Sequence, residues 1–210
     1  MILRRDFYAR PTLDVARDLM GKILVHRSAD GLAAGRIVEV EAYIGEDDPA
    51  CHAAVGRTPR NAPLYGPPGR AYVYLNYGLH HLVNAVTEPD GDPAAVLIRA
   101  LEPVDGLALM RRRRGTAPWR AGKAPVPDWA LCRGPGNLTR ALGITLEQNM
   151  VPLTRGPLTI VDDGAHCGTV ACGSRIGISA GLDKAWRLVE AGNRCVSARA
   201  LTRSAAPRSG

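Results

Sequence analysis

The chain has 210 residues, of which 46% are hydrophobic and 22% are charged, and its formal net charge is +7 at pH 7. This length and composition predict one globular domain and exclude an intrinsically disordered chain. The excess of positive charge favours an anionic partner, most commonly nucleic acid, without establishing one.

Two further features bear on where the protein works. The chain contains no run of about 18 apolar residues, and its N-terminal segment lacks the apolar core of a signal peptide. Its cysteines are odd in number, which indicates free thiols, and the cluster of His166, Cys167 and Cys172 lacks the paired CxxC spacing of a zinc site. We therefore expect a cytoplasmic protein with no membrane association and no bound metal.

The N-terminal part is predicted to contain one helix and two strands. Apolar residues at helical spacing predict a helix over residues 14–19, which Gly21 ends. Residues 22–26 are typical of a short strand, and residues 36–43 alternate like a half-buried strand.

The middle of the chain begins with a long connection over residues 45–70, rich in Gly, Pro, Asp and Arg, and long ordered loops are often functional. Three strands are predicted after it, over residues 71–77, 82–87 and 94–101. The turn-forming residues 88–93 predict that the last two form a hairpin.

Two helices are predicted in the following segment. Residues 103–114 have a helical pattern that ends in four arginines, and a Gly- and Pro-rich loop over residues 115–127 follows. A second helix is predicted over residues 137–142, with Asn137 as its N-cap.

The C-terminal part adds three short strands, over residues 158–161, 174–179 and 186–190. Strands outnumber helices and do not alternate with them, which predicts an α+β fold with a curved, largely antiparallel sheet and peripheral helices. We expect a single domain over residues 1–200 and a flexible tail over residues 201–210.

A pair of carboxylates lies on the strand over residues 36–43. The alternation places Ile37, Glu39, Glu41 and Tyr43 on one face of that strand. A carboxylate beside an aromatic ring at a strand end can act as a general base toward water. Acidic residues on an exposed strand face are, however, commonly just solvated.

Three tyrosines fall within six positions, at Tyr72, Tyr74 and Tyr77. Aromatic faces stack on nucleobases and attract cations, although tyrosines are also common in strands for packing reasons. The preceding loop carries Arg57 and Arg60, which could hold phosphates on a backbone stiffened by Pro and Gly, or could simply be solvated.

The order and spacing of these motifs together are specific. The chain resembles the alkyladenine DNA glycosylase family, also called 3-methyladenine DNA glycosylases, from residue 3 to about residue 198. The matching segments are EVEAY at 39–43, His52, RTPRN at 57–61, YVYLNYG at 72–78, Asn84, VLIRALEP at 96–103, RGP-NL at 133–138, RIGI at 175–178 and GN-VS at 192–197.

The resemblance implies roles for individual residues. Glu41 corresponds to the base that activates the attacking water, and Arg99 to the arginine whose charge helps keep that carboxylate ionised. Asn84 corresponds to the amide that excludes undamaged guanine. The residues implied to line the base pocket are Tyr43, His52, Tyr74 and Asn84.

Tyr77 corresponds to the side chain that enters the minor groove and fills the gap left by the extruded nucleotide. In an unbroken strand Tyr77 would point away from the face of Tyr74, so this role requires the strand to end or turn near Gly78. Weaker contacts with DNA are expected from Arg57, Arg60, Asn61, Tyr72, Arg133 and Arg175.

The implied activity is DNA repair by a glycosylase that flips alkylated or deaminated purines out of double-stranded DNA. It would hydrolyse the N-glycosidic bond and leave an abasic site. A lyase step needs an amine nucleophile, and no lysine falls between Glu41 and Arg99, which favours monofunctional hydrolysis. No HExxH or Walker A motif is present, so we expect no cofactor. We also expect a nucleoid-associated monomer, and the accepted lesions stay open.

Two other classes of function are compatible with parts of this pattern. A non-catalytic DNA- or RNA-binding module could use the same fold, which resembles the C-terminal part of some tRNA-modifying formyltransferases, but it would have no use for a carboxylate in its groove. A metal-dependent hydrolase is disfavoured by the irregular spacing of its candidate ligands His52, His80, His81 and His166. The resemblance assigns no role to Cys51, His80 or His81.

Overall fold

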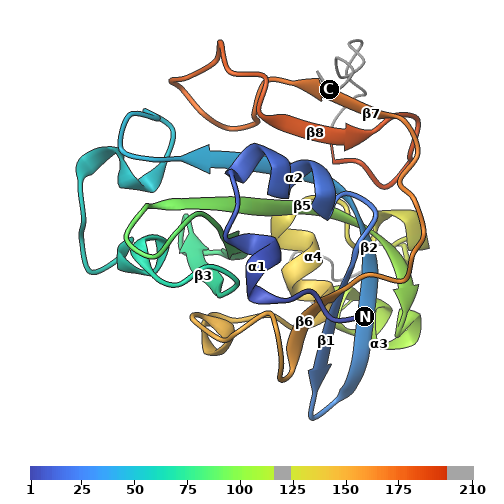
Figure 1. Cartoon of the computed structure of the whole chain (residues 1–210). Coiled ribbons are helices and arrows are strands. Elements are labelled where there is room, and N and C mark those ends of the chain that lie inside the picture. Colours follow the sequence, from blue (N-terminus) through green and yellow to red (C-terminus); the bar gives the residue numbers. More distant parts are fainter. Residues whose placement is uncertain (116–123, 198–210) are drawn as a thin grey trace.

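A computed structural model describes residues 1–115 and 124–197. Within these residues eight strands form one sheet in which every pairing is antiparallel. The strands are β1 (Ile23–Ser28), β2 (Gly31–Ile44), β3 (Ala71–Asn76), β4 (His80–Val86), β5 (Ala94–Asp105), β6 (Leu158–Val161), β7 (Val170–Gly173) and β8 (Arg187–Glu190). The curled antiparallel sheet with few helices confirms the predicted α+β fold (Figure 1).

The helices are short and lie around this sheet. The α-helices are α1 (Arg5–Tyr8), α2 (Thr12–Leu19), α3 (Leu107–Gly115) and α4 (Pro135–Leu142). The 3-10 helices are η1 (His52–Val55), η2 (Ala62–Tyr65), η4 (Asp128–Ala130) and η5 (Leu146–Gln148). Thus η1 and η2 give local structure to the long connection between β2 and β3, and they place its side chains against the sheet.

The long strand β2 organises the sheet. The strand order is β3-β4-β5-β2-β1-β6, and β8 also pairs with β2 and carries β7 on its other edge. One edge of β2 therefore meets β5 along most of its length, while the other edge meets β1 first and β8 afterwards. In Figure 1 the β7–β8 pair lies at the top and β1 and β6 lie at the bottom.

Two β-bulges lie side by side where β2 pairs with β5. Val38 is the extra residue on β2, and Arg99 is the extra residue on β5. A bulge bends its strand and redirects neighbouring side chains. Ile37 consequently packs in the main core, so the prediction that it shares a face with Glu39 and Glu41 is wrong.

Two amphipathic helices cover the strands that carry the candidate site. Helix α2 buries Val15 and Leu19 and packs on β2 and β5, while α4 buries Leu138 and Leu142 and packs on β4 and β5. The spacing of four residues places each pair on one face of its helix. Each such side chain contributes about 1.5–3 kcal/mol of burial energy, which holds the helices against these strands.

Most predicted strands and the hairpin between β4 and β5 are confirmed, whereas the start of one helix and the N-cap of another are corrected. Residues 103–105 continue β5 because they pair with β2, and the helix begins only after Gly106. At Gly106 φ is +77° and a Cβ would lie 2.2 Å from the Leu32 carbonyl oxygen, so only glycine fits this junction. Asn137 lies inside α4, whose N-cap is Gly134.

The predicted strand over residues 174–179 is also wrong. The strand at this place is β7, which ends at Gly173, and residues 174–186 form an irregular connection to β8. Part of the predicted loop over 115–127 and the predicted tail over 201–210 lie outside the described residues. No helix in the described ranges is long and apolar enough to cross a membrane.

Candidate active site

Glu41 lies on β2 at a point where β5 and β8 flank it on both edges. Its side chain is fully buried, and its carboxylate accepts three hydrogen bonds. Oε2 accepts from the Tyr43 hydroxyl at 2.9 Å and from Nη1 of Arg99 at 3.0 Å, and Oε1 accepts from the backbone N–H of Ile176 at 2.7 Å. Donors from three separate segments therefore hold the carboxylate in one orientation.

Burial raises the pKa of Glu41 above its ordinary value of 4.5. The charge of Arg99 and the hydrogen bonds from Ile176 and Tyr43 act in the opposite direction, because they favour the ionised form. Arg99 therefore has the expected effect, but desolvation is the larger one. A carboxylate with a raised pKa is a stronger base once it is ionised.

A cavity of about 390 Å³ lies beside this carboxylate. The three residues that hydrogen-bond Glu41 line the cavity, although Glu41 itself is not among the lining residues. The aromatic side chains in the lining are Tyr43, His52, Tyr72, Tyr74 and Tyr77, and the aliphatic ones include Leu64, Leu82 and Leu97. This size and lining are typical of a pocket for a small planar ligand.

The aromatic walls of the cavity fall into two parts. The ring of Tyr74 lies 4.6 Å from that of His52 and 5.2 Å from that of Tyr72, measured between centroids. Tyr43 forms the other wall and carries the guanidinium of Arg175 at 4.7 Å from its ring centroid. Nδ1 of His52 lies 2.9 Å from the Tyr72 hydroxyl, and burial lowers the pKa of His52, so the imidazole is uncharged at neutral pH.

Asn84 lies on β4 directly opposite Tyr72 of β3 and lines the cavity. Its side chain is buried, and its Nδ2 donates to the backbone carbonyl of Tyr72 at 3.0 Å. This hydrogen bond fixes the position of the amide at the cavity wall.

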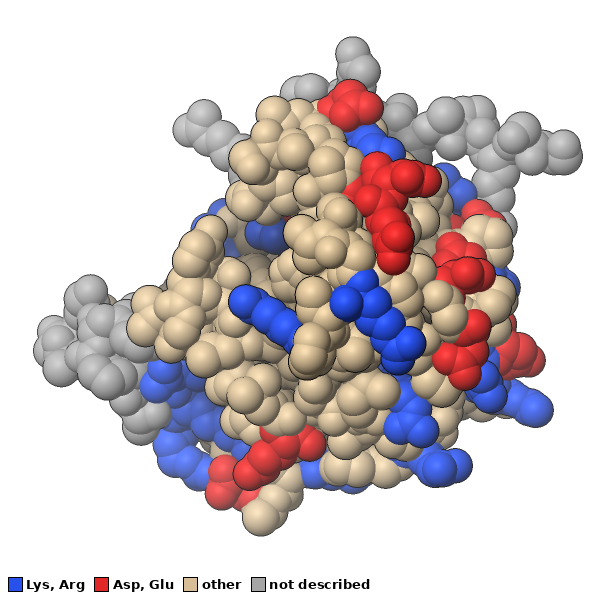
Figure 2. Space-filling view, turned by 90° about the vertical axis from the view of Figure 1, so that its left-hand side faces the viewer, with Lys and Arg blue, Asp and Glu red and all other residues tan. Residues whose placement is uncertain are grey.

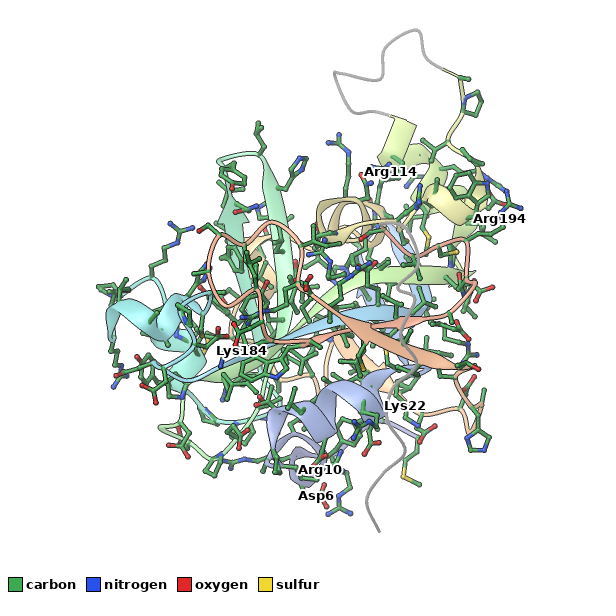
Figure 3. All side chains as sticks on the ribbon, turned by 90° about the horizontal axis from the view of Figure 1, so that it is seen from above. Asp6, Arg10, Lys22, Arg114, Lys184 and Arg194 are labelled. Atoms are coloured by element: carbon green, nitrogen blue, oxygen red, sulfur yellow. The ribbon has the colours of Figure 1, made fainter. Side chains whose placement is uncertain are left out.

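Tyr77 lies at the tip of the β3–β4 hairpin. Strand β3 ends at Asn76, and Tyr77 and Gly78 form the turn with φ values of +49° and +67°. The strand therefore ends where the role suggested for Tyr77 requires it to end. The Tyr77 side chain is 86% exposed and also borders the cavity. In Figure 3 the hairpin tip and the α1–α2 segment lie on opposite sides of the molecule.

Two of the arginines expected to contact DNA are exposed in the connection between β2 and β3. Arg57 lies over the Tyr65 ring at 5.5 Å, and Arg60 donates from Nη2 to the Leu75 carbonyl at 3.3 Å, beside the hairpin. On the side of the molecule shown in Figure 2, lysine and arginine side chains form several separate groups, and acidic side chains lie at the top, along the right-hand side and at the lower left of the view. The positive charge is thus dispersed over this side.

Three other residues expected to contact DNA are buried in the structure. Burial corrects this expectation for Asn61 and Arg175, whereas Tyr72 lines the cavity, where its contact with DNA stays a prediction. The amide of Asn61 donates to the His52 carbonyl at 2.7 Å and stabilises the loop around η1. Tyr72 lies within the cavity wall. Arg175 forms a buried ion pair with Asp48 at 2.5 and 2.7 Å, and its exposure of 4% leaves no face for a phosphate.

Arg133 is half-buried near η4. Its Nε donates to the Val196 carbonyl at 2.7 Å, and its guanidinium lies 5.5 Å from the Trp129 ring centroid. These contacts tie the start of α4 to the last described residues. Because the residue is only partly buried, a contact with DNA stays an expectation.

The sequence did not indicate two contributions to the site. Ile176 supplies a backbone donor to Glu41, and the only signal for it in the sequence is the RIGI segment, whose pattern predicts a strand. The alternation of β2 pairs Glu39 with Glu41, whereas in the structure Glu39 lies behind Glu41 and binds Arg99 and Arg187. Long-range contacts of this kind leave no local pattern in a sequence.

Cys51 precedes His52 and lines the cavity. Burial raises the pKa of its thiol to about 11, so the group is protonated and unreactive at neutral pH. Across residues 1–115 and 124–197, no three His, Cys, Asp or Glu side chains come together in a way that could hold a metal ion.

Comparison with known proteins places this sequence in a family. The sequence model described as Methylpurine-DNA glycosylase (MPG) matches residues 6–194. A protein of Methanocella arvoryzae is 46% identical over 202 residues, which cover 95% of this chain and 97% of the relative. Proteins of Burkholderia lata and Burkholderia cenocepacia are 49% and 50% identical over 199 residues, covering 93% of this chain and 91% of each relative. All three carry names that provisionally assign them as 3-methyladenine DNA glycosylases.

Proposed function

The chain belongs to the methylpurine-DNA glycosylase family, and from this membership we infer that it is a DNA-repair enzyme, a DNA-3-methyladenine glycosylase that hydrolyses N-glycosyl bonds. We further propose that it acts on alkylated and deaminated purines flipped out of double-stranded DNA and leaves an abasic site. The observation that carries this proposal is the buried, triply hydrogen-bonded carboxylate of Glu41 beside an aromatic cavity.

Glu41 is the proposed general base. Its Oε2 already accepts two hydrogen bonds, whereas Oε1 accepts one and keeps a lone pair for a water molecule. A water bound there would lie next to Ile176, which lines the cavity, and within reach of a sugar whose base occupies the cavity. The proposed step is transfer of a water proton to Oε1 while oxygen attacks C1′ and the purine leaves.

The cavity is proposed to hold the flipped base between Tyr43 and His52. Methylation at N3 or N7 makes a purine in DNA cationic, and the face of Tyr43 attracts a cation. His52 is uncharged at neutral pH, so it does not repel that base. A cationic base needs little protonation to leave, whereas a deaminated purine has a neutral ring and needs more help from the pocket.

Tyr77 is proposed to occupy the space that the extruded nucleotide leaves in the duplex. Its exposed position at the hairpin tip and its place at the cavity rim support this role. One side chain would then touch both the duplex and the entrance of the base pocket.

The proposed hydrolysis needs no amine nucleophile. In the described part of the chain, neither Lys22 nor Lys184 lines the cavity, and the N-terminal amine of Met1 donates to the Asp162 carbonyl. These positions support a monofunctional enzyme, because a lyase forms a Schiff base with an amine close to C1′.

The test is an oligonucleotide duplex that carries one defined lesion, with 7-methylguanine, hypoxanthine and ethenoadenine in parallel duplexes. We expect strand scission only after hot alkali, which marks an abasic site. Scission without alkali, or covalent trapping of the protein by borohydride, would contradict the monofunctional mechanism. Absence of alkali-labile sites for every lesion would contradict the proposed activity.

A further inference from the structure

A second buried carboxylate lies behind Glu41, and the mechanism proposed above does not use it. Glu39 is fully buried and accepts four hydrogen bonds. Its Oε1 accepts from Nε of Arg99 at 3.1 Å, from Nε of Arg187 at 2.7 Å and from the Ser197 hydroxyl at 2.9 Å, and its Oε2 accepts from the Ser197 N–H at 2.6 Å. Contacts from β5, β8 and the segment after β8 thus converge on one carboxylate.

Arg99 joins the two carboxylates. Its Nε binds Glu39 and its Nη1 binds Glu41, so one planar guanidinium is held at two of its nitrogens. Arg99 is also the bulged residue of β5 and lines the cavity. Its orientation toward Glu41 is therefore set from behind by Glu39.

A purely structural role for Glu39 does not explain this arrangement well. Buried ion pairs contribute little net stability compared with well-packed apolar side chains, because both charges lose their hydration. The arrangement instead has a consequence for Glu41. An arginine bound to Glu41 alone would neutralise it more fully than one shared with a second carboxylate.

We propose that Glu39 is a positioning residue for the glycosylase reaction: it holds Arg99 by Nε, so that the guanidinium orients Glu41 without neutralising it, and Glu41 stays a competent base. This proposal rests on the function proposed above. It assigns to Glu39 no contact with substrate or water.

Several charged and titratable groups face Glu41 and bear on its ionisation. Arg99 on β5 lowers the pKa of Glu41, as does the Tyr43 hydroxyl on β2, whereas the negative charge of Glu39 raises it. The other charged or titratable side chains near Glu41 are Tyr74 on β3, Arg175 in the β7–β8 connection and Arg187 on β8. Loss of the Glu39 charge therefore removes a neighbouring negative charge that raises the pKa of Glu41.

The experiment measures release of 3-methyladenine from duplex DNA methylated with dimethyl sulfate, in single turnover and across pH. For Glu39→Gln we expect the midpoint of the acidic limb to move down by about one pH unit. Glu41 loses a neighbouring negative charge and no longer shares the positive charge of Arg99 with a second carboxylate. We also expect the plateau rate to fall roughly ten- to hundredfold, since a weaker base and a less fixed arginine remain.

Two variants separate this effect from general damage to the buried network. Arg187→Met breaks the same network but keeps the Glu39 charge and its bond to Arg99, so its acidic limb should not move down. Glu39→Gln alone leaves the buried guanidinium of Arg187 without its counter-charge, which can impair folding. The double variant Glu39→Gln with Arg187→Met removes that guanidinium as well, so the effect on Glu41 can still be measured if the single variant folds poorly. The acidic limb of the double variant should lie below that of Arg187→Met, as the limb of Glu39→Gln lies below that of the wild type.

An acidic limb at the wild-type position in both variants that carry Glu39→Gln would overturn the proposal, as would an equal downward shift for Arg187→Met. Either result would leave the glycosylase activity itself untouched. Full activity of Glu41→Gln would instead overturn the proposed base, so the two failures are distinguishable.

Discussion

At the scale of single residues, the site is defined by how Glu41 is desolvated. The carboxylate is removed from water, yet it receives donors from Tyr43, Arg99 and Ile176. Full burial without such donors would keep it protonated, and full solvation would make it a weak base. The observed balance is what a general base near neutral pH requires.

Replacing the base while keeping its shape should abolish the chemistry. For Glu41→Gln we expect excision to fall by about 10²–10⁴-fold, the usual contribution of a general base. Binding to lesion-containing duplex, measured by fluorescence anisotropy, should change little because the side chain does not line the cavity. Loss of binding in parallel with activity would instead indicate that the variant is misfolded.

The pH dependence of the reaction should report on the environment of Glu41. Only the ionised carboxylate accepts a proton, and its folded pKa lies above 4.5, so activity on methylated purines should be lost as pH falls through a midpoint above that value. Tyr43→Phe removes a donor that favours the ionised form, and we expect it to move the midpoint up by as much as about one unit. A midpoint that moves down in this variant would contradict the assignment.

At the scale of elements, two connections between strands carry the site. The β3–β4 hairpin extends Tyr77 from the surface, and the irregular connection between β7 and β8 brings Ile176 to Glu41. Both depend on local features that rigidify them. The hairpin has a turn with two positive φ angles, and the connection is anchored by the buried pair of Arg175 and Asp48.

The hairpin tip should matter for opening the duplex. For Tyr77→Ala we expect excision from a fully paired duplex to fall about 10–100-fold, which corresponds to the loss of one stacked aromatic ring. Excision from a lesion in a mismatched bubble should fall much less, because the base is already unstacked. The melting temperature should stay the same, since the ring is 86% exposed.

The buried ion pair should matter for folding of the β7–β8 connection. Asp48→Asn leaves the guanidinium of Arg175 buried without a counter-charge, and we expect a loss of about 3–5 kcal/mol in the free energy of unfolding. Asp128→Asn is a matched control. The side chains of Asp128 and of its partner Arg111 are both about half exposed, so the loss in the free energy of unfolding, measured by urea denaturation, should be less than about 1 kcal/mol.

At the scale of the whole molecule, curvature and charge act together. The sheet curls so that β2, β3, β4 and β5 all contribute to one cavity, and α2 and α4 pack against three of these strands, β2, β4 and β5. The net charge is +7, and on the face shown in Figure 2 the lysine and arginine side chains form separate groups. The charge therefore favours encounter with DNA in general, while in the proposed function the cavity selects the base.

Binding to undamaged duplex should be strongly dependent on salt, because positive side chains displace counterions from the phosphates. We expect Arg60→Ala to reduce the slope of log Kd against log salt by about one, as for one lost phosphate contact. Arg5→Ala removes an exposed arginine on α1, on the side away from the hairpin, and should leave the slope unchanged. Equal slopes for wild type and Arg60→Ala would show that Arg60 does not contact phosphate.

The sequence alone determined the features that depend on local pattern or on motif order. Alternating and helical periodicity predicted most strands, helix α2 and the β4–β5 hairpin. The motif order EVEAY, RTPRN and YVYLNYG indicated the family, which the family comparison and the relatives bear out. Such features follow from neighbours along the chain, and a single sequence contains them in full.

Only the tertiary structure decided what depends on contacts between distant segments. The paired bulges at Val38 and Arg99 changed the face to which Ile37 belongs, and burial turned Arg175 from an expected DNA contact into the partner of Asp48. The donor from Ile176 to Glu41 spans 135 positions of the chain. Burial and charge pairing arise when the sheet curls, so the local sequence around each residue does not encode them.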